Sequence, residues 1–541
     1  MSFRRRFRID LNSADILMPA SLAPSTRSQQ TTGLRYWMLR VLDECDNVSA
    51  NFSPDAVHDL RVSLRRCRSL ADGLMAIDPD PGWKAMKKAG KRLFQRLGDL
   101  RDIHVMQEWV EKLENAHAER ALSPASVEPS QNLPPAGESQ PAGSPARVLL
   151  IMLKDREAKQ KLEAQAALEE FDRKQWKRWS KSLPARAARI RPGSAVLKHL
   201  ALERWTEARV LHARAQRNRS QSAFHSLRIG IKGFRYIIEN FLPIEHKAWS
   251  DGLKEMQDLL GEVHDLDVLW STAISCRVFP DEHSRQRWHE QIISQRAKRI
   301  ERYRAKMIGE NSLWQVWRAP LPQGKEIQEL ATRRMKLWAN HLDPDFPHSE
   351  RVANLALQLY DGLLGIAWRP AIDADSARFT LRAAALLHDV GKSEGEKDHH
   401  KKSFKLVQSH GEPLGWKPAD FNRAAIVARF HRGSLPTRRH KLLRDLLPDE
   451  QKAAIQLCAI LRLANALDAS HDGPVRRLLV ERNDHDSRAP SACVSVAVEA
   501  YSAHSATARV VAAERYLLET ILHRPILIKR MSSRMHGADR P

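Results

Sequence analysis

The chain has 541 residues, more than one hydrophobic core usually supports, so two or three domains are expected. Its 88 Lys and Arg against 65 Asp and Glu give a formal net charge of +23, which predicts a polyanionic partner such as nucleic acid, inorganic polyphosphate or an anionic membrane surface. Scattered cysteines without a C-x-x-C pair and the lack of a long apolar run argue against a zinc ribbon, a disulfide framework and a membrane span, and predict a cytoplasmic protein.

Helices are expected from the start of the chain, after a flexible arm at residues 1–30. The periodicity at 33–50 predicts one helix, and Ser53-Pro54-Asp55 supplies a cap and a first-turn proline for the next. Another helix, rich in lysine, is expected to begin at Trp83 and to end within 97–103.

Two interleaved rows follow the predicted helix at 57–70. The apolar row is Val57, Leu60, Leu64 and Cys67, and the basic row, one residue later, is His58, Arg61, Arg65 and Arg68. These spacings of three and four residues place an apolar face beside a cationic face on one helix.

The same pattern returns near residue 225. Its apolar row is Phe224, Leu227, Ile231 and Phe234, and its basic row is His225, Arg228, Lys232 and Arg235. The histidines are 167 residues apart, and the Leu-Gly pairs that begin at Leu97 and Leu260 are 163 apart, so an internal duplication is predicted. We expect one helical domain at 31–312, with halves at 31–120 and 147–312 and a flexible Pro/Ser-rich insertion at 121–146.

Arginine suits a phosphate-binding row because its planar guanidinium stays charged and binds phosphate oxygens with two hydrogen bonds. Two such helices facing each other would line a positive groove. The alternative is an ordinary solvated helix face, which the recurrence of the pattern disfavours. The histidines would either contact phosphate when protonated or orient their neighbours. Nucleic acid is the less favoured partner, because the basic rows lack regularly interleaved aromatic residues.

Together, the His-x-x-Arg rows and the Leu-Gly motifs resemble the CHAD family, the conserved-histidine α-helical domains. The resemblance covers about residues 25–310 and implies two four-helix bundles related by pseudo-symmetry, with a basic channel for inorganic polyphosphate. The residues it assigns to polyphosphate are His58, Arg61, Arg65, Arg66, Arg68, Lys88, Lys91, His225, Arg228, Lys232 and Arg235. Lys232 and Gly233 replace the Arg65 and Arg66 of the first copy, so the second face is expected to bind more weakly.

A second predicted helical region, at 326–470, contains a candidate metal cluster. His388 and Asp389 are adjacent at the end of an apolar helix, His348 begins an earlier helix, and Asp468 ends a later one. Imidazole and carboxylate groups are common ligands of divalent metals. After residue 470, runs rich in β-branched residues at 475–480 and 492–500 predict short strands before a helix at 512–523.

The order His, His-Asp, Asp resembles the HD phosphohydrolase superfamily. More closely, the region 326–530 resembles the C-terminal HD-type domain of exopolyphosphatases and guanosine pentaphosphatases. The resemblance implies a divalent Mg, Mn or Fe ion held by His348, His388, Asp389, His399, His431 and Asp468, with His400 as the alternative to His399. Asp389 and Lys392 are the expected catalytic residues, with Arg432 contacting phosphate.

The sequence therefore predicts a mainly α protein with a duplicated CHAD bundle, an HD-type domain and a small C-terminal strand-containing subdomain. The leading hypothesis is a polyphosphate-binding protein with a metal-dependent phosphohydrolase-like domain that acts on polyphosphate or on guanosine penta- or tetraphosphate. The alternative is a non-enzymatic adaptor at polyphosphate granules, because the Gly-rich phosphate loops of the exopolyphosphatase catalytic domains are missing from the sequence. The oligomeric state stays open, a homodimer being one alternative.

Overall fold

The structure is a computed structural model that describes residues 33–121, 144–366, 368–473, 475–482 and 493–531. The predicted arm at 1–30 and almost all of the predicted insertion at 121–146 lie outside these residues. The chain divides into two compact units, one of Met1–Ala76 with Asp80–Gln323 and the other of Ile77–Pro79 with Gly324–Pro541. The described residues are helical apart from loops and three short strands in the second unit, which confirms the predicted mainly α fold.

The first unit contains two successive sets of helices. The first set is α1 (Leu34–Ala50), α2 (Pro54–Met75), α3 (Pro81–Ala89), α4 (Lys91–Ala121), α5 (Pro145–Glu169) and α6 (Arg173–Ala187). The second set is α7 (Ala195–Asn218), α8 (Gln221–Phe241), α9 (Pro243–Ser275), α10 (Glu282–Met307) and α11 (Leu313–Arg318). The predicted basic rows lie on α2 and α8, and the two Leu-Gly motifs lie on α4 and α9.

Helices α2 and α8 begin in the same way. The Ser53 hydroxyl accepts a hydrogen bond from the Ala56 amide at 3.2 Å, and the Ser220 hydroxyl accepts one from the Ala223 amide at 3.3 Å. The predicted apolar rows are at most 3% exposed: Val57, Leu60, Leu64, Cys67, Phe224, Leu227, Ile231 and Phe234. The basic rows are therefore left on the helix sides that face away from the core of each set.

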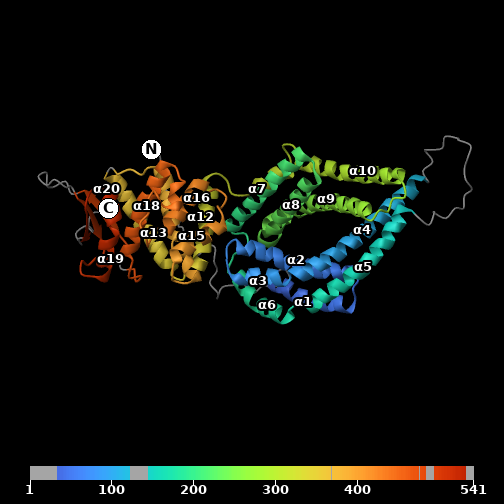
Figure 1. Ribbon diagram of the computed structural model, residues 1–541, viewed down its shortest axis with the longest axis horizontal. Coiled ribbons are helices and arrows are strands. Elements are labelled where there is room, and N and C mark those ends of the chain that lie inside the picture. The colour runs from blue at the N-terminus through green and yellow to red at the C-terminus, as the bar shows by residue number, and fades with distance from the viewer. Residues whose placement is uncertain (1–32, 122–143, 367, 474, 483–492, 532–541) are drawn as a thin grey trace, which may run out of the picture. The chain divides into compact units, whose positions relative to one another are not determined.

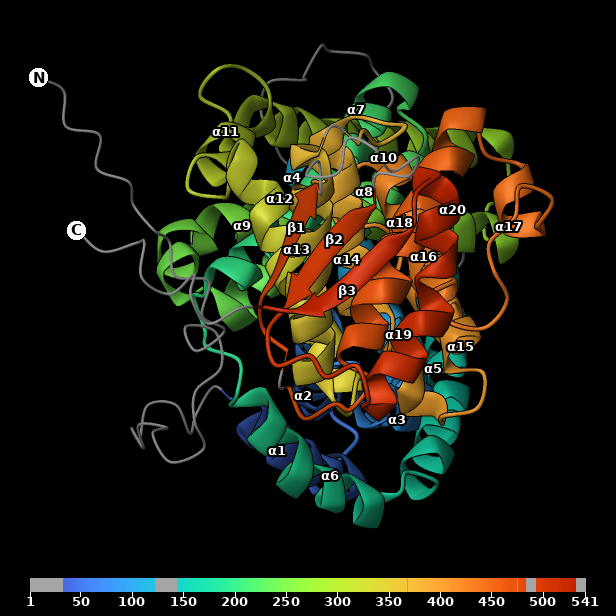
Figure 2. The same ribbon diagram turned by 90° about the vertical axis from the view of Figure 1, so that its left-hand side faces the viewer.

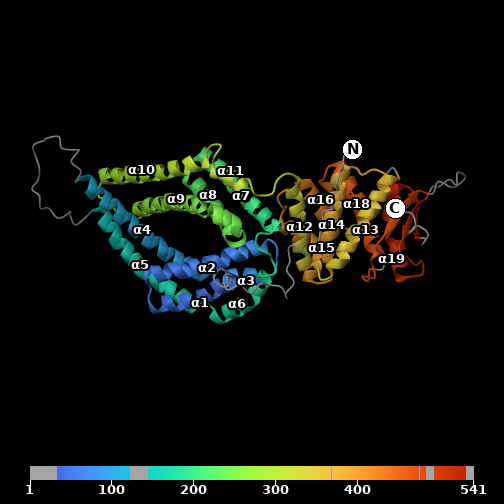
Figure 3. The same ribbon diagram turned by 180° about the vertical axis from the view of Figure 1, so that it is seen from behind.

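The two sets of helices meet where α2 packs on α8 and α4 packs on α9. Figure 1 shows α1–α6 on one side of the unit and α7–α10 on the other, and Figure 3 shows the same arrangement from behind. Helices that carry equivalent sequence motifs are therefore paired with each other across the unit, which brings the two basic rows toward one another.

One helix boundary in this unit differs from the prediction. The helix that begins near Trp83 ends at Ala89, and α4 then continues without interruption through the Leu97-Gly98 motif. Gly98 does not end the helix; a side chain there would instead place its Cβ 2.7 Å from Arg61 Nη1. Gly98 therefore makes room for an arginine of the basic row on α2.

The second unit begins with a helical bundle. Its helices are α12 (Lys325–Leu342), α13 (Phe346–Gly365), α14 (Ala374–Leu387), the 3₁₀ helix η4 (Val390–Glu394), α15 (His399–His410), α16 (Pro418–Arg429), α17 (Lys441–Arg444) and α18 (Pro448–Leu467). Helix α18 is buried over most of its length and packs against α13, α14 and α16. The apolar residues of these helices form one continuous core.

A small sheet and two helices complete the second unit. The strands are β1 (Leu478–Arg482), β2 (Val494–Val498) and β3 (Ile526–Arg530), and the helices are α19 (Ala506–Glu514) and α20 (Tyr516–Leu522). Strand β2 lies in the middle, antiparallel to β1 and parallel to β3, as Figure 2 shows. Two strands were predicted, but β3 was not, because five residues with only one fully buried side chain give a weak alternation.

None of the helices in the described residues is both long enough and apolar enough to cross a membrane.

Candidate metal centre and cationic cluster

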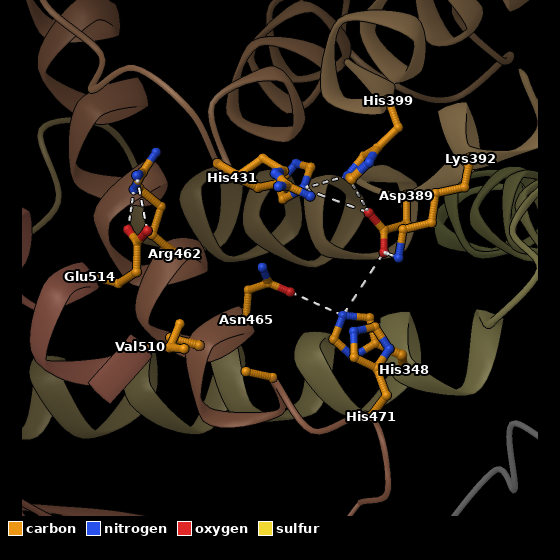
Figure 4. Close-up of a pocket in the computed structure, with 13 residues that line it drawn as sticks. His348, Asp389, Lys392, His399, His431, Arg462, Asn465, His471, Val510 and Glu514 are labelled. Atoms are coloured by element: carbon orange, nitrogen blue, oxygen red, sulfur yellow. Dashed lines mark hydrogen bonds and ion pairs between the residues drawn. The ribbon is translucent and has the colours of Figure 1, made fainter. Parts of the chain in front are cut away.

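Five side chains that the sequence predicted as metal ligands converge in the second unit. His348 lies in the first turn of α13, His388 and Asp389 follow α14, His399 begins α15, and His431 follows α16. Each is at most 2% exposed. Figure 4 shows His399, His431 and Lys392 around the Asp389 carboxylate. The structure therefore assembles the cluster from four helix ends, which are fixed by the core of the unit.

Backbone carbonyls determine which ring nitrogen carries the hydrogen in three of these imidazoles. Nδ1 of His388, His399 and His431 lies 2.7, 3.0 and 2.8 Å from the carbonyl oxygens of Ala385, Glu396 and Ala428. Because a carbonyl only accepts hydrogen bonds, Nδ1 carries the hydrogen in each ring and Nε2 keeps its lone pair. Histidines that bind metals are usually oriented in this way.

The Asp389 carboxylate lies between two groups of imidazoles. Its Oδ1 is 3.1 Å from His399 Nε2 and 3.6 Å from His431 Nε2, and its Oδ2 is 3.4 Å from His388 Nε2 and 3.9 Å from His348 Nε2. The ligand atoms within each group all lie within 4.8 Å of one another. The two groups, which share Asp389, are His348/His388/Asp389 and Asp389/His399/His431.

Three ring nitrogens in the cluster are left without a hydrogen bond. His399 Nε2 and His431 Nε2 are 3.2 Å apart, although the carbonyl contacts leave both nitrogens with lone pairs. His388 Nε2 is buried and has no hydrogen-bond partner among the described residues. A buried nitrogen without a partner is costly. A cation in the Asp389/His399/His431 group would satisfy His399 and His431, and one in the His348/His388/Asp389 group would satisfy His388. The residues present therefore fit a divalent metal.

The charge states also suit metal binding. Burial raises the pKa of Asp389, but His388, His399, His431 and the Lys392 ammonium outweigh it and hold this pKa below its usual range. Burial lowers the pKa of His388 and of His431, which favours the neutral form of both imidazoles. A carboxylate and neutral imidazoles are the forms that bind metal ions.

The structure distinguishes His399 from His400 as the ligand and gives Asp468 a different role from the predicted one. Of the two adjacent histidines, His399 lies in the cluster, whereas the His400 ring lies against Gly433. Asp468 is in neither ligand group. Its Oδ2 lies 2.7 Å from His348 Nδ1 and accepts a hydrogen bond from Arg351 Nε at 3.0 Å, so it orients His348 from behind.

A cavity of about 220 Å³ opens beside the cluster. Lys392 and Arg432, which the sequence predicted to contact phosphate, line it, and the Lys392 ammonium is 2.6 Å from Asp389 Oδ2. Three further ionisable residues that line the cavity were not among the predicted site residues: Arg462, His471 and Glu514. The signal for Arg462 was available, because an arginine inside the apolar run of α18 needs a buried partner.

A cluster of four cations lies where α2 meets α8 in the first unit. Arg61 and Arg65 come from α2, and Arg228 and Lys232 come from α8. Arg61 Nη1, Arg65 Nε and Arg228 Nε are buried without a hydrogen-bond partner. Among the described residues, none of the four has a carboxylate within ion-pair distance. We call these four residues the cationic cluster.

Lys232 shows how strongly these charges repel one another. Burial, followed by the charges of Arg228, Arg65 and Arg61, lowers its pKa to about 7, while Asp265 opposes the shift only partly. Asp102 and Asp265 lie near enough to act on these charges without forming an ion pair with them. The cationic cluster therefore holds positive charge that no ion pair neutralises, which is the electrostatic condition for binding a polyanion.

The remaining residues of the predicted polyphosphate surface have other partners or lie in solvent. Arg66 and Arg235 both pair with Glu239, and Arg68 donates a hydrogen bond to the Lys87 carbonyl at 2.9 Å. His225 Nδ1 lies 3.3 Å from Nδ1 of His264 on α9. The three exposed residues are His58, Lys88 and Lys91.

Comparison with known families assigns both units. A family model described as the CHAD domain matches residues 38–273, and one described as Ppx/GppA phosphatase, domain III matches residues 332–491. The chain therefore contains a CHAD domain followed by a domain of the Ppx/GppA domain III type. This confirms the resemblance to the CHAD family and the resemblance to the C-terminal domain of exopolyphosphatases and guanosine pentaphosphatases.

Among solved structures, the chain is similar to the crystal structure of the CHAD domain from the plant Ricinus communis. The two are 19% identical with a TM-score of 0.33, over 55% of this chain and 92% of that chain. No curated protein matches the sequence.

Proposed function

We propose that the chain binds inorganic polyphosphate through its CHAD domain and hydrolyses a phosphate compound at an HD-type metal centre in its second domain. The observation that carries the hydrolase proposal is the pair of ligand groups that share Asp389, in which the ring hydrogens of three histidines are fixed on the side away from the carboxylate. The substrates that we propose are polyphosphate and guanosine penta- or tetraphosphate.

A divalent Mg, Mn or Fe ion held by either ligand group would neutralise charge on a phosphoryl oxygen and make a water molecule more acidic. The protein's own residues would bind and orient the substrate. Lys392 and Arg432 line the cavity beside the ligands and would contact phosphate oxygens. Asp389, which belongs to both ligand groups, would link them. Burial of the ligands keeps bulk water away from the cluster.

Polyphosphate binding is supported by the cationic cluster. A linear chain of phosphates would supply the acceptors that Arg61 Nη1, Arg65 Nε and Arg228 Nε lack, and would relieve the repulsion around Lys232. Both copies of the repeated motif contribute to the cluster, so one polymer would contact both halves of the domain. We place such a protein in the cytoplasm, at polyphosphate granules.

The second candidate is a non-enzymatic adaptor that attaches to polyphosphate. It is favoured by the second family match, because the matching model describes only the third domain of a phosphatase. In this case the metal centre would be structural or would bind a regulator.

Phosphate release decides between the two candidates. Purified full-length protein, stripped with a chelator and reloaded with Mn²⁺ or Mg²⁺, is assayed with polyphosphate, guanosine pentaphosphate and guanosine tetraphosphate. We expect Asp389→Asn to abolish metal-dependent release. The matched control is Asp361→Asn, because Asp361 is an exposed aspartate that pairs with Arg378 on the surface of the same domain. Phosphate release that does not depend on metal, or that Asp389→Asn leaves unchanged, would reject the hydrolase and leave the non-enzymatic adaptor as the remaining candidate.

Competition binding tests the partner. At fixed salt, long-chain polyphosphate is expected to displace a labelled polyphosphate probe at lower concentration than RNA of the same charge. Arg228→Gln should weaken polyphosphate binding about 10-fold or more, because it removes a charged donor that has no other partner. Arg285→Gln, which removes an exposed arginine paired with Glu282, should have little effect. Stronger binding of RNA would reject polyphosphate as the partner.

A further inference from the structure

Arg462 is a buried arginine that connects three segments of the second unit. It lies on α18 and its side chain is 5% exposed. Its Nε donates to Glu514 Oε2 at 2.6 Å and its Nη2 to Glu514 Oε1 at 3.2 Å. The same guanidinium donates through Nη1 to the Phe430 carbonyl at 3.0 Å and through Nη2 to the Gly433 carbonyl at 3.2 Å. The pair and its position beside the cavity are visible in Figure 4.

The two carbonyls lie on either side of His431 and Arg432. His431 is a candidate metal ligand, and Arg432 lines the cavity. Arg462 therefore fixes the turn after α16 that carries both side chains. Glu514 supplies the negative charge that a guanidinium in this buried position requires. Because Glu514 is the last residue of α19, the position of this turn depends on a helix more than 70 residues further along the chain.

We propose that the Arg462–Glu514 pair couples α19 to the Asp389/His399/His431 ligand group, so that a divalent ion in this group and the docking of α19 stabilise each other. This inference rests on the proposed metal centre. Coupling between two sites acts equally in both directions, so α19 raises the affinity for the ion by the same factor by which the ion favours the docked helix. Arg462 and Glu514 act here as positioning residues.

We expect the coupling to act on one of the two ligand groups. Arg462 holds the turn that carries His431, whereas among the described residues neither Arg462 nor Glu514 makes a hydrogen bond to His348 or His388. His348 is oriented by Asp468 and Asn465 instead. The two groups can therefore be distinguished experimentally, although they share Asp389.

The test uses Mn²⁺ and the full-length protein. Calorimetric titration gives the affinity of each group, and amide hydrogen exchange reports the protection of Ala506–Glu514. In the wild type, Mn²⁺ should slow exchange in this segment. Glu514→Gln should weaken Mn²⁺ binding at one group about 10-fold, as is typical for partners that orient a ligand, and should remove the added protection. His399→Ala should also remove this protection, whereas His388→Ala should retain it.

A matched variant separates coupling from general loss of stability. Arg423 on α16 pairs with Glu450, and the exposed fractions of the two side chains, 3% and 25%, are close to the 5% and 25% of Arg462 and Glu514. The remaining hydrogen bonds of Arg423 go to Asp420, Ser376 and Thr380, away from the ligands. Glu450→Gln should lower the melting temperature, by less than Glu514→Gln does because Arg423 keeps its ion pair with Asp420, and should leave both Mn²⁺ affinities unchanged. Arg462→Lys, which keeps the charge but loses the forked geometry, should reproduce the effect of Glu514→Gln on Mn²⁺ binding.

The outcomes also separate this inference from the proposed function. If the wild type binds Mn²⁺ but Glu514→Gln and Arg462→Lys bind it with unchanged affinity, the coupling is rejected while the metal centre stands. The coupling is equally rejected if Glu450→Gln weakens Mn²⁺ binding as much as Glu514→Gln does. If the wild type does not bind Mn²⁺, the metal centre itself is rejected, and the coupling with it.

Discussion

Lys232 is the residue whose pKa is most affected by burial within the cationic cluster. Its pKa is lowered from 10.5 to about 7 by burial and by the guanidinium groups of Arg228, Arg65 and Arg61. Between these two pH values, the unfolded chain holds a proton that the folded chain has lost. Lys232 therefore makes the folded state more stable as the pH rises from about 7 toward 10, which is opposite to the effect of a lysine in an ion pair.

Polyphosphate binding should reverse this loss of the proton. Negative charge next to Lys232 raises its pKa, so the complex takes up a proton and affinity falls as the pH rises from 7 to 9. We expect Lys232→Arg, which stays charged over this range, to reduce that dependence. Dissociation constants measured at several pH values and constant ionic strength check this. Equal pH dependence in the wild type and the variant would show that Lys232 does not titrate on binding.

Asp468 gives a second prediction at the scale of single residues. It orients His348 through Nδ1, so Asp468→Asn should weaken Mn²⁺ binding at the His348/His388/Asp389 group about 10- to 100-fold. Affinity at the Asp389/His399/His431 group should stay close to that of the wild type. Calorimetric titration of the variant checks both values, and an equal loss at both groups would contradict the assignment of Asp468 to His348 alone.

At the scale of helices and strands, local periodicity was informative wherever one face of an element is buried. The apolar rows on α2 and α8 were predicted residue by residue, because each turns a regular stripe into the core. The uninterrupted course of α4 was not predicted, because Gly98 was read as the end of a helix. Gly98 instead makes room for Arg61, which approaches from another helix. Strand β3 was missed because its register depends on β2, not on its own alternation.

The metal centre, like the helices and strands, was predicted from the sequence only in part. Its histidines occur in short motifs at helix ends, so the motif order identified them. Arg462 and Glu514 are 52 residues apart. The apolar run around Arg462 indicates that this arginine needs a buried partner, but only the fold identifies Glu514 as that partner. The carbonyl contacts that set the ring hydrogens are likewise properties of backbone geometry, which residue identity does not encode.

The crossing of α2 and α8 leads to a prediction for two glycines. A Cβ at Gly73 would collide with the Phe241 ring, whereas one at Gly233 would meet no atom within 4 Å. Gly73→Ala should therefore lower the free energy of unfolding by about 1–3 kcal/mol. Gly233→Ala should raise it by about 0.5–1 kcal/mol, because alanine loses less entropy in a helix. Denaturant unfolding of both variants checks this, and stabilisation by Gly73→Ala would contradict the close packing.

At the scale of the whole molecule, the chain has two compact units, each with a candidate site of its own. A ligand that binds only a folded unit stabilises that unit, by about 2.7 kcal/mol at 100 times its dissociation constant. We expect polyphosphate to raise the melting temperature of the CHAD unit and Mn²⁺ that of the second unit, each by several degrees. Calorimetry with each ligand alone, together with hydrogen exchange to assign the transitions, checks this.

Two variants serve as controls for the melting experiment. Arg228→Gln should remove most of the shift caused by polyphosphate and leave the shift caused by Mn²⁺, and Asp389→Asn should do the reverse. A single ligand that raises both transitions equally would show that the assignment of one ligand to each unit is wrong.

The donor atoms around Asp389 also bear on competition among ions in a cell. Four imidazoles contribute nitrogen to the two groups, and one shared carboxylate contributes oxygen. Mg²⁺ binds nitrogen poorly and keeps much of its water, whereas Fe²⁺ and Zn²⁺ accept imidazole readily. Although Mg²⁺ is among the ions proposed for this centre, we expect a scarce transition metal to occupy it even where Mg²⁺ is in large excess. The protein would then depend on the trace-metal supply of its cell.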